Sequence, residues 1–137
     1  MILVDSGPLV ALFDPRDDAH VGAQGTLQKV AEPMVTTIPV LTEVFHLLGP
    51  ATQGANALRE FMRRGGLGVW YLLADTLGRS LELMDQYADH PMDLADASLV
   101  AAAETLRTTR VFTIDRNDFQ SYRARFGRRL RGFTMIS

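Results

Sequence analysis

Short apolar runs alternate with segments of helical periodicity along almost the whole chain, and this alternation limits the folds that it can adopt. The runs that we predict to be strands are residues 1–4, 34–37, 67–72, 111–114 and 133–136. A first helix is predicted to begin after Ser6, which would be its cap. Further helices are predicted over residues 17–31, 39–48, 52–64, 75–89, 93–107 and 118–125. Strands that alternate with helices imply a largely parallel sheet covered on both faces. The predicted fold class is therefore α/β, a three-layer α/β/α sandwich with a mainly parallel sheet of four or five strands.

The length and composition suit one globular domain over residues 1–137, since a chain of about 150 residues buries roughly two thirds of its unfolded surface. The longest apolar stretches, such as residues 69–74, are too short to cross a bilayer. The N-terminus has neither the basic region nor the apolar segment of a secretory signal, so we expect a cytoplasmic protein with no membrane contact. The absence of cysteine excludes disulfides, thiolate metal sites and cysteine nucleophiles.

Acidic residues fall where the carboxyl ends of the predicted strands meet. Asp5 and Asp115 each follow an apolar run directly, and parallel strands bring such positions to the same edge of the sheet. A helix that follows a strand starts at that edge. Glu43 lies in the first turns of one such helix, and Asp96 takes the third position of another if Asp93 is its cap. We therefore expect Asp5, Glu43, Asp96 and Asp115 to converge.

Each of these acids also has a purely structural interpretation. Asp5 and Asp115 suit turns or caps, and Glu43 suits a solvated helix face. Asp96 suits a helix N-terminus, where an anion is favoured. Its segment, Leu-Ala-Asp-Ala-Ser-Leu-Val-Ala-Ala-Ala, has scarcely any polar face, so the carboxylate should be largely buried and in need of a partner such as a metal ion. Asp118 is interpreted chiefly as the cap of the helix after it.

A cluster of carboxylates favours a particular chemistry. The charges repel one another, and in a site of low dielectric some take up protons unless a cation neutralises them. Oxygen ligands alone select hard ions such as Mg²⁺ or Mn²⁺. Such ions polarise phosphoryl oxygens and activate water, which favours hydrolysis of a phosphodiester. His20, His46 and His90 lack metal-ligand spacing and are interpreted as surface or core residues.

The net charge of −2 conceals an asymmetry along the chain. Residues 1–106 carry 6 basic and 14 acidic side chains, whereas residues 107–137 carry 8 arginines and 2 aspartates. The arginines, of which Arg116 and Arg123 are the RNA-binding candidates, either contact phosphates or form a solvated surface. Lys29 is the only lysine, which excludes a Walker-type phosphate loop and a receiver domain with a lysine after its last strand.

At these residues the sequence resembles the PIN-domain family, and in particular the VapC-like toxins of bacterial toxin–antitoxin systems. The matching segments are Ile-Leu-Val-Asp-Ser-Gly-Pro-Leu-Val-Ala-Leu from Ile2, Thr-Thr-Ile-Pro-Val-Leu-Thr-Glu-Val from Thr36, Met-Asp-Leu-Ala-Asp-Ala-Ser-Leu-Val-Ala-Ala-Ala-Glu from Met92 and Val-Phe-Thr-Ile-Asp-Arg-Asn-Asp-Phe from Val111. They occur in the family's order over almost the whole chain. The family's four acids fall on Asp5, Glu43, Asp96 and Asp115, and none is missing.

The resemblance implies a Mg²⁺- or Mn²⁺-dependent endoribonuclease that acts as the toxin of a type II pair. It implies that Asp5, Asp96 and Asp115 bind the cation, while Glu43 is a further ligand or positions the attacking water. Cleavage would leave a 5′-phosphate and a 3′-hydroxyl.

The resemblance further implies that Ser6 lies near the metal, with Asp118 as a second accessory candidate. It also implies a homodimer and a small antitoxin that occludes the site with a basic side chain. Tyr71 and Tyr122 are candidates for stacking on a base, although the aromatic residues are otherwise assigned to the core. The alternative function is a catalytically silent PIN-like module that only binds RNA or protein.

Overall fold

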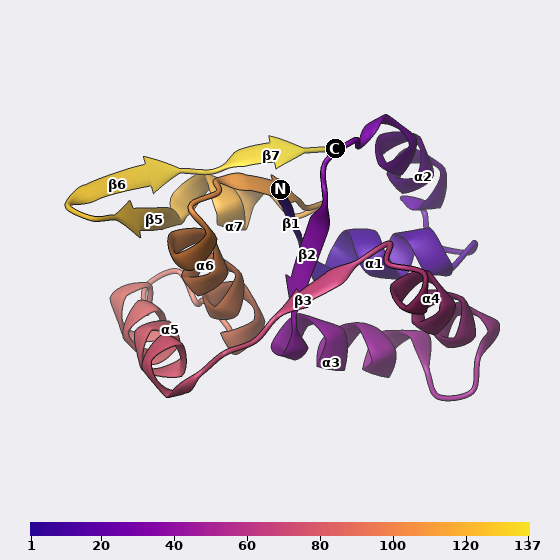
Figure 1. The fold of residues 1–137 in the computed structure, drawn as a ribbon, viewed down its shortest axis with the longest axis horizontal. Coiled ribbons are helices and arrows are strands. Elements are labelled where there is room, and N and C mark those ends of the chain that lie inside the picture. The colour runs from indigo at the N-terminus through magenta and orange to yellow at the C-terminus, as the bar shows by residue number, and fades with distance from the viewer.

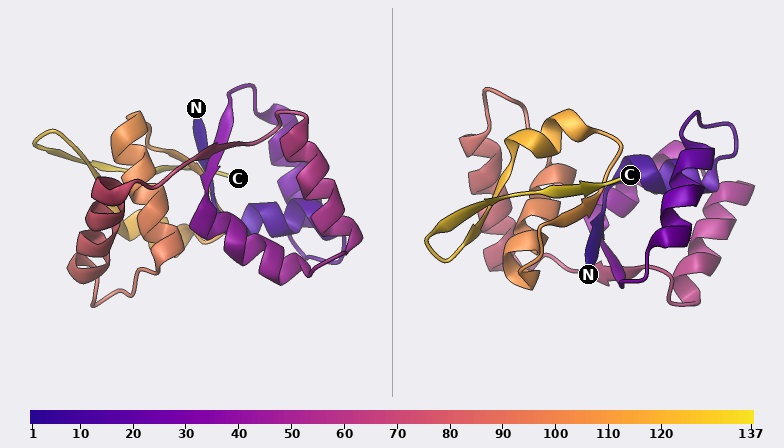
Figure 2. Two further views of the ribbon diagram at one scale, coloured as in Figure 1. Left: turned by 60° about the horizontal axis from the view of Figure 1, so that its bottom comes forward. Right: turned by 90° about the horizontal axis from the view of Figure 1, so that it is seen from above.

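A five-stranded sheet, parallel throughout, forms the centre of the molecule (Figures 1 and 2). The computed structural model describes residues 1–137. The strand order is β3-β2-β1-β4-β7, and the strands are β1 (Ile2–Val4), β2 (Met34–Thr37), β3 (Gly68–Trp70), β4 (Arg110–Phe112) and β7 (Thr134–Ile136). All five predicted strands are present, although most are shorter than predicted. The expected α/β sandwich is confirmed.

Seven helices accompany the sheet: α1 (Ser6–Phe13), α2 (His20–Lys29), α3 (Ile38–Leu48), α4 (Gln53–Arg63), α5 (Ala74–Gln86), α6 (Leu94–Leu106) and α7 (Arg116–Ser121). Helices α5 and α6 pack together on one side of the sheet, and α1, α2 and α4 lie on the other (Figures 1 and 2). Helix α3 contacts both α1 and α6 and so links the two sides. None of these helices has the length and apolar character needed to cross a membrane.

The core explains why β1 lies at the centre of the sheet. All three of its residues are buried, with Leu3 and Val4 completely inaccessible, because neighbouring strands flank β1 on both edges and helices cover both faces. Helix α6 is also buried along most of its length. Residues 97–103 are all buried, since this segment packs against α5, α3 and the sheet. The nearly apolar helix predicted from the sequence is thus an interior helix, and its few polar residues lie towards its two ends.

Helix caps correct two of the predictions. Asp5, and not Ser6, is the N-cap of α1, because the Asp5 side chain accepts the Ser6 N–H while Ser6 is already helical. Asp118 is not a cap either. Helix α7 begins at Arg116, and its cap is Asp115, whose side chain accepts the Asp118 N–H. Asp93 caps α6, as predicted.

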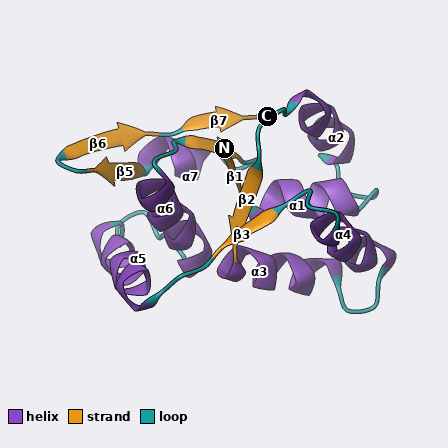
Figure 3. Ribbon diagram, in the orientation of Figure 1, coloured by secondary structure: helices purple, strands orange, loops and turns teal.

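A second, two-stranded sheet was not predicted. The helix expected over residues 118–125 ends at Ser121, and β5 (Arg123–Phe126) pairs with β6 (Arg129–Gly132) in an antiparallel hairpin (Figure 3). Gly127, at the first position of the two-residue turn, has a φ of 61°, a conformation that favours glycine. Ala124 is fully buried because β5 packs on α6, so tertiary packing and the turn override the helical preference of this segment.

Candidate active site

The four predicted acids lie around one cavity at the carboxyl edge of the sheet. The cavity has a volume of about 770 Å³, and its charged lining is entirely acidic, with no lysine or arginine. The acidic residues that line it are Asp5, Asp17, Asp18, Glu43, Asp93, Asp96, Asp115 and Asp118. The predicted convergence is therefore what the structure contains. Sequence reasoning missed Asp17 and Asp18, which lie in the α1–α2 connection and follow no strand.

Asp5 follows β1 directly and is the most buried of these carboxylates, with 7% of its surface exposed. Its Oδ1 accepts the backbone N–H of Ser6 at 2.8 Å, and its Oδ2 accepts the hydroxyl of Thr113 at 2.8 Å. Burial raises the pKa of Asp5 to about 6, although the two hydrogen bonds oppose this rise, and the nearby charge of Glu43 adds to it. Asp5 thus holds its charge only against a considerable electrostatic penalty.

Glu43 reaches the cavity from the second turn of α3. Its Oε1 accepts a hydrogen bond of 3.2 Å from the hydroxyl of Ser6, the first residue of α1. The contact is possible because α1 and α3 pack side by side. Ser6 therefore contacts two of the acids, Asp5 through its backbone and Glu43 through its side chain, which agrees with its predicted place beside the site.

Asp96 lies in the first turn of α6 and is held from two directions. Its backbone N–H donates to Asp93 Oδ1 at 2.8 Å, and its own Oδ2 accepts the hydroxyl of Tyr122 at 2.8 Å. Burial raises the pKa of Asp96 to about 7, and the charges of Asp5 and Asp93 raise it further against the opposing effect of the Tyr122 hydrogen bond. Asp96 and Asp5 are thus two carboxylates whose charges destabilise each other.

The loop after β4 and the start of α7 supply the last two acids. Asp115 is solvent-exposed, and its backbone N–H donates to the Thr113 hydroxyl at 3.1 Å. Asp118 pairs with His90, whose Nε2 lies 2.9 Å from Asp118 Oδ1. Burial raises the pKa of Asp118, while the hydrogen bond from His90 opposes that rise. Asp118 is therefore an additional acid of the cavity.

Two neutral side chains that support the acids were not predicted. Thr113 contacts Asp5 and Asp115, and it is fully buried. A buried threonine two residues before Asp115 needs a hydrogen-bond partner, and this is the sequence signal that could have identified it. Tyr122 is also fully buried, so the interpretation that it stacks on a base is wrong. No local pattern marks its contact with Asp96, because 26 residues separate the two.

The two arginines predicted to bind RNA both make contacts within the chain. Arg116 donates from Nη1 to Ser137 Oγ at 3.2 Å. Arg123 donates from Nη1 to the carbonyl oxygens of Gln120 and Tyr122, at 2.7 and 2.8 Å, and so covers the C-terminal end of α7. Both remain solvent-exposed, but Arg123 has a structural role that the sequence did not reveal.

The chemistry of the cavity fits a hard divalent cation. Every charged group available is a carboxylate, and oxygen ligands are those that Mg²⁺ and Mn²⁺ prefer. A cation would also stabilise the charged forms of Asp5 and Asp96, which burial and nearby acids disfavour. No three acidic or histidine side chains are already arranged around a common point as a metal site, so these carboxylates would have to rotate towards an ion to share it.

The fold and the cavity together define an α/β protein with a polycarboxylate site at the carboxyl edge of a parallel sheet. The sequence model of the PIN domain matches residues 2–124, and the chain belongs to this family. The family assignment made from the sequence motifs is thus confirmed.

The similar proteins are VapC toxins or toxin complexes. The chain is 27% identical over 138 residues to Ribonuclease VapC26 of Mycobacterium tuberculosis, and the alignment covers 98% of this chain and 99% of that protein. The fold is similar to that of M. tuberculosis VapC20, a toxin described as cleaving the sarcin–ricin loop, with a TM-score of 0.74, 20% identity, and coverage of 84% of this chain and 90% of the other. A toxin–antitoxin complex from Klebsiella pneumoniae gives a TM-score of 0.67 at 22% identity, over 88% and 92% of the two chains. The likeness to VapC-like PIN proteins therefore extends over almost the full length.

Proposed function

We propose that this chain is a metal-dependent endoribonuclease, the toxin of a type II toxin–antitoxin pair. The observation that carries the proposal is that Asp5 is buried and Asp96 half-buried at one cavity whose charged lining is wholly acidic. Such an arrangement lowers the stability of the fold, because a pKa raised by one unit corresponds to about 1.4 kcal/mol. A module that only binds RNA or protein does not need acids clustered at this cost in stability, whereas a metal-dependent hydrolase needs them to bind its metal ion.

In this proposal Asp5, Asp96 and Asp115 would hold Mg²⁺ or Mn²⁺. The cation would supply polarisation of the scissile phosphodiester and activation of water. Glu43 would position the attacking water or serve as a further ligand, and Asp118 would be an accessory acid. Hydrolysis in which water attacks phosphorus in line leaves a 5′-phosphate and a 3′-hydroxyl.

The chain's own hydrogen bonds prepare these acids for their roles. Thr113 and the Ser6 N–H each bind one oxygen of Asp5, which fixes the plane of its carboxylate. The Ser6 hydroxyl orients Glu43, and the Tyr122 hydroxyl leaves one oxygen of Asp96 free to face the cavity. Orientation by such outer hydrogen bonds raises the affinity of a site for its metal.

A cleavage assay tests the function. The wild-type protein should cut a labelled single-stranded RNA in Mg²⁺ or Mn²⁺ and not in EDTA, with a 5′-phosphate on the downstream product. Asp5→Asn and Asp115→Asn should each abolish cleavage, since a neutral amide is a poor ligand for these ions. RNA binding with no cleavage in any metal would instead support the catalytically silent module.

An antitoxin is part of the same proposal. A small protein with a basic side chain, arginine above all, would bind among the acids, because the cavity offers eight carboxylates and no cation of its own. Inhibition should then weaken as the Mg²⁺ concentration rises. Co-purification without any small partner, or inhibition that does not depend on Mg²⁺, would contradict this part of the proposal.

We also propose that residues 1–137 act as one domain, that the protein functions in the cytoplasm, and that it forms a homodimer. Analytical ultracentrifugation of the purified protein tests the dimer.

Arg116 and Arg123 remain candidates for RNA contact because both are exposed, although each makes hydrogen bonds inside the chain. The single substitution Arg116→Ala tests whether Arg116 contacts RNA, because it leaves the bonds of Arg123 at the end of α7 in place.

A further inference from the structure

The β5–β6 hairpin projects from the body of the protein. It extends past α6, on the side away from α2 and α4, and the chain then runs from β6 into β7 (Figures 1 and 2). The turn at Gly127 and Arg128 forms its tip. Residues 123–132 are called the arm below.

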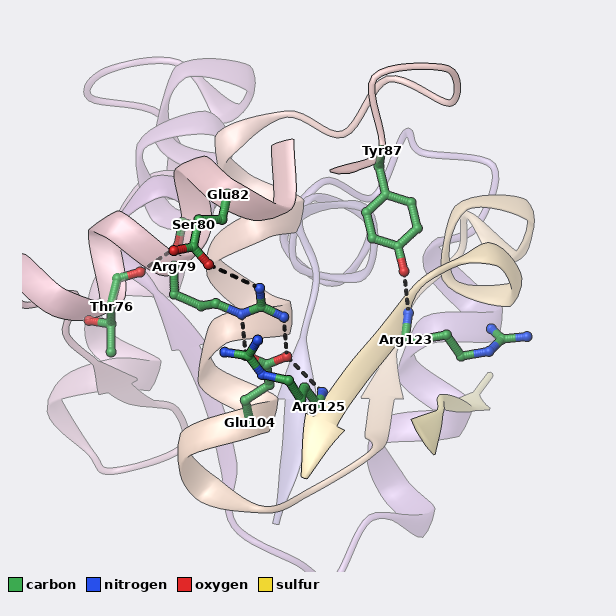
Figure 4. Close-up of polar contacts among 8 residues, drawn as sticks. All are labelled: Thr76, Arg79, Ser80, Glu82, Tyr87, Glu104, Arg123 and Arg125. Atoms are coloured by element: carbon green, nitrogen blue, oxygen red, sulfur yellow. Dashed lines mark hydrogen bonds and ion pairs between the residues drawn. The ribbon is translucent and has the colours of Figure 1, made fainter. Parts of the chain in front are cut away.

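Side chains of α5 and α6 hold the arm in place. The backbone N–H of Arg125 donates to Glu104 Oε2 at 2.7 Å, and that of Arg123 donates to the hydroxyl of Tyr87 at 2.9 Å (Figure 4). Arg79 holds Glu104 in turn, with bonds of 2.8 and 3.0 Å from Nε and Nη2 to the two carboxylate oxygens. Backbone groups on the free edge of β5 are thereby satisfied, and the arm is fixed relative to α6.

The arm concentrates positive charge that no acidic side chain neutralises. Residues 119–137 contain no aspartate or glutamate, and none of the arm's arginines forms a salt bridge. The arginines of the arm are Arg123, Arg125, Arg128, Arg129 and Arg131. Arg131 and Arg107, the C-cap of α6, both lie against the ring of Phe126, with guanidinium carbons 5.6 and 5.9 Å from its centre. Positive charges gathered in this way are stabilised by an anion.

The charge distribution identifies the anion as a nucleic-acid backbone. Residues 1–106 carry 6 basic and 14 acidic side chains, and the cavity has no cationic lining, so the surroundings of the acids repel a polyanion. Contacts of arginine and lysine with phosphates supply most of the electrostatic affinity for nucleic acid, and the guanidinium fork suits phosphate oxygens. The arm is the largest group of unpaired arginines, so it is the part of the chain that can attract RNA.

The arm also begins at the wall of the cavity. Tyr122, the residue before β5, contacts Asp96, and a four-residue strand spans about 14 Å at 3.4 Å per residue. From there β5 runs along α6 to its other end, where Phe126 lies against Arg107, so a strand of RNA that reaches the acids can continue along the arm. Arg123 at the base is bonded to carbonyl oxygens, which leaves the arginines beyond it to contact phosphates.

We propose that the arm binds the phosphate backbone of the RNA substrate where it extends beyond the acidic cavity, through Arg125, Arg128 and Arg129. This inference rests on the proposed ribonuclease function and extends it to the way in which the substrate is held. It shifts the main RNA contacts from Arg116 and Arg123 to the outer part of the hairpin.

The test measures the binding of a labelled single-stranded RNA by fluorescence anisotropy in EDTA, over a series of KCl concentrations. An arm variant carries Arg125→Ala, Arg128→Ala and Arg129→Ala. Its plot of log Kd against log salt should lose a slope of about 2, or 0.7 for each lost phosphate contact, and its Kd at low salt should rise at least tenfold. Lysine at the same three positions should retain most of the slope, which separates lost charge from lost folding.

The matched control removes the same number of charges from α4, which lies on the far side of the molecule from the arm (Figure 1). It carries Arg59→Ala, Arg63→Ala and Arg64→Ala, and its slope should equal that of the wild type. An equal loss of slope in this control would show that net charge alone matters and would overturn the proposal. So would an arm variant with the slope of the wild type, or one that keeps RNA binding but loses a co-purifying protein partner.

Cleavage separates this inference from the function on which it rests. If the wild type cuts RNA and the arm variant has the same KM, the inference about the arm is wrong and the ribonuclease function stands. If the wild type neither binds nor cuts RNA in any metal, the proposed function itself fails. The expected result is a KM raised at least tenfold in the arm variant.

Discussion

The hydroxyl of Tyr122 donates a hydrogen bond of 2.8 Å to Asp96, and this bond joins the start of the hairpin to the first turn of α6. The phenol ring is held by three neighbours in edge-to-face contact, Tyr87 at 5.2 Å, Phe119 at 5.3 Å and His90 at 6.2 Å between ring centres. A donor fixed so firmly determines which oxygen of Asp96 remains free for the cavity.

Tyr122→Phe should therefore weaken metal binding while the fold is kept. Loss of an outer hydrogen bond to a metal ligand typically lowers metal affinity 10- to 100-fold. Titration with Mn²⁺, followed by electron paramagnetic resonance of the free ion, measures this directly. Tyr87→Phe is the matched control, since it removes a hydroxyl from the same aromatic cluster that contacts the Arg123 N–H and no acid. Equal Mn²⁺ affinity in the two variants would mean that Tyr122 has only a packing role.

Asp96→Asn should abolish metal-dependent cleavage without destabilising the metal-free protein. The amide keeps the shape of the side chain and can still accept the Tyr122 hydrogen bond, but it removes a charge that Asp5 and Asp93 repel. The melting temperature in EDTA should be unchanged or higher.

The control for this variant is Asp75→Asn. Asp75 also lies in the first turn of a helix, α5, and does not line the cavity, so its loss should cost about 0.3 to 1 kcal/mol of stability and leave cleavage intact. If Asp96→Asn behaves in that way instead, Asp96 is a structural residue and the site assignment fails.

The stability of the metal-free protein should fall as the pH rises from about 4 to about 7. In the folded state burial raises the pKa of Asp5 to about 6 and that of Asp96 to about 7, against an ordinary value of 3.8 for an aspartate side chain. Over this range the folded protein holds protons that the unfolded chain has already released, so protonation favours folding at the acidic end. The rise for Asp5 alone corresponds to a loss of about 3 kcal/mol, and Asp96, which solvent reaches in part, adds to it.

Thermal melts in EDTA at pH 5 and pH 8 measure this effect. The melting temperature should be higher at pH 5, and Mg²⁺ should raise it most at pH 8, where both carboxylates are ionised. The double variant Asp5→Asn, Asp96→Asn should show little of this dependence. A wild-type melting temperature that increases from pH 5 to pH 8 in EDTA would show that Asp5 and Asp96 do not determine the pH dependence of stability.

Glu104→Ala should loosen the arm and destabilise the fold by about 3 kcal/mol. Its partner Arg79 is only 15% exposed, and a charge left unpaired at such a site is unfavourable. Hydrogen exchange at the Arg125 amide, which donates to Glu104, should accelerate. Glu82→Ala is the comparison, since Glu82 also pairs with Arg79 but is 67% exposed, and its loss should change stability by less than about 1 kcal/mol. Equal effects of the two substitutions would argue against Glu104 as the anchor.

The parts of the fold that the sequence predicts well are those determined by local patterns. Residues 34–37 form β2 as predicted, and Asp93 caps α6, because an apolar run and a capping residue carry their own signals. The convergence of the four acids on one cavity was also predicted, since the ends of parallel strands and the starts of the following helices share one edge. The topology of the sheet thus places Asp5 and Asp96 near each other without any knowledge of side-chain packing.

The parts that were missed depend on contacts between distant segments. Arg-Ala-Arg-Phe is compatible with a helix by local propensity, and it is a strand because Ala124 packs on α6 and two side chains bind its backbone. Tyr122 was assigned to the core or to base stacking, and its bond to Asp96 depends on the packing of β5, the strand that follows it, against α6. Helix boundaries near Asp115 were shifted because aspartates three residues apart can both act as caps.

The chain leaves the cavity wall at Tyr122 and returns to the edge of the sheet at β7, where Thr134 pairs with Arg110. The arm is thus an insertion between two points that the fold already fixes. Residues can be added to or removed from the turn at Gly127 without moving any carboxylate, because both ends of the insertion are held independently. Under the proposed function, the length of RNA bound along the arm and the position of cleavage can then change independently of each other.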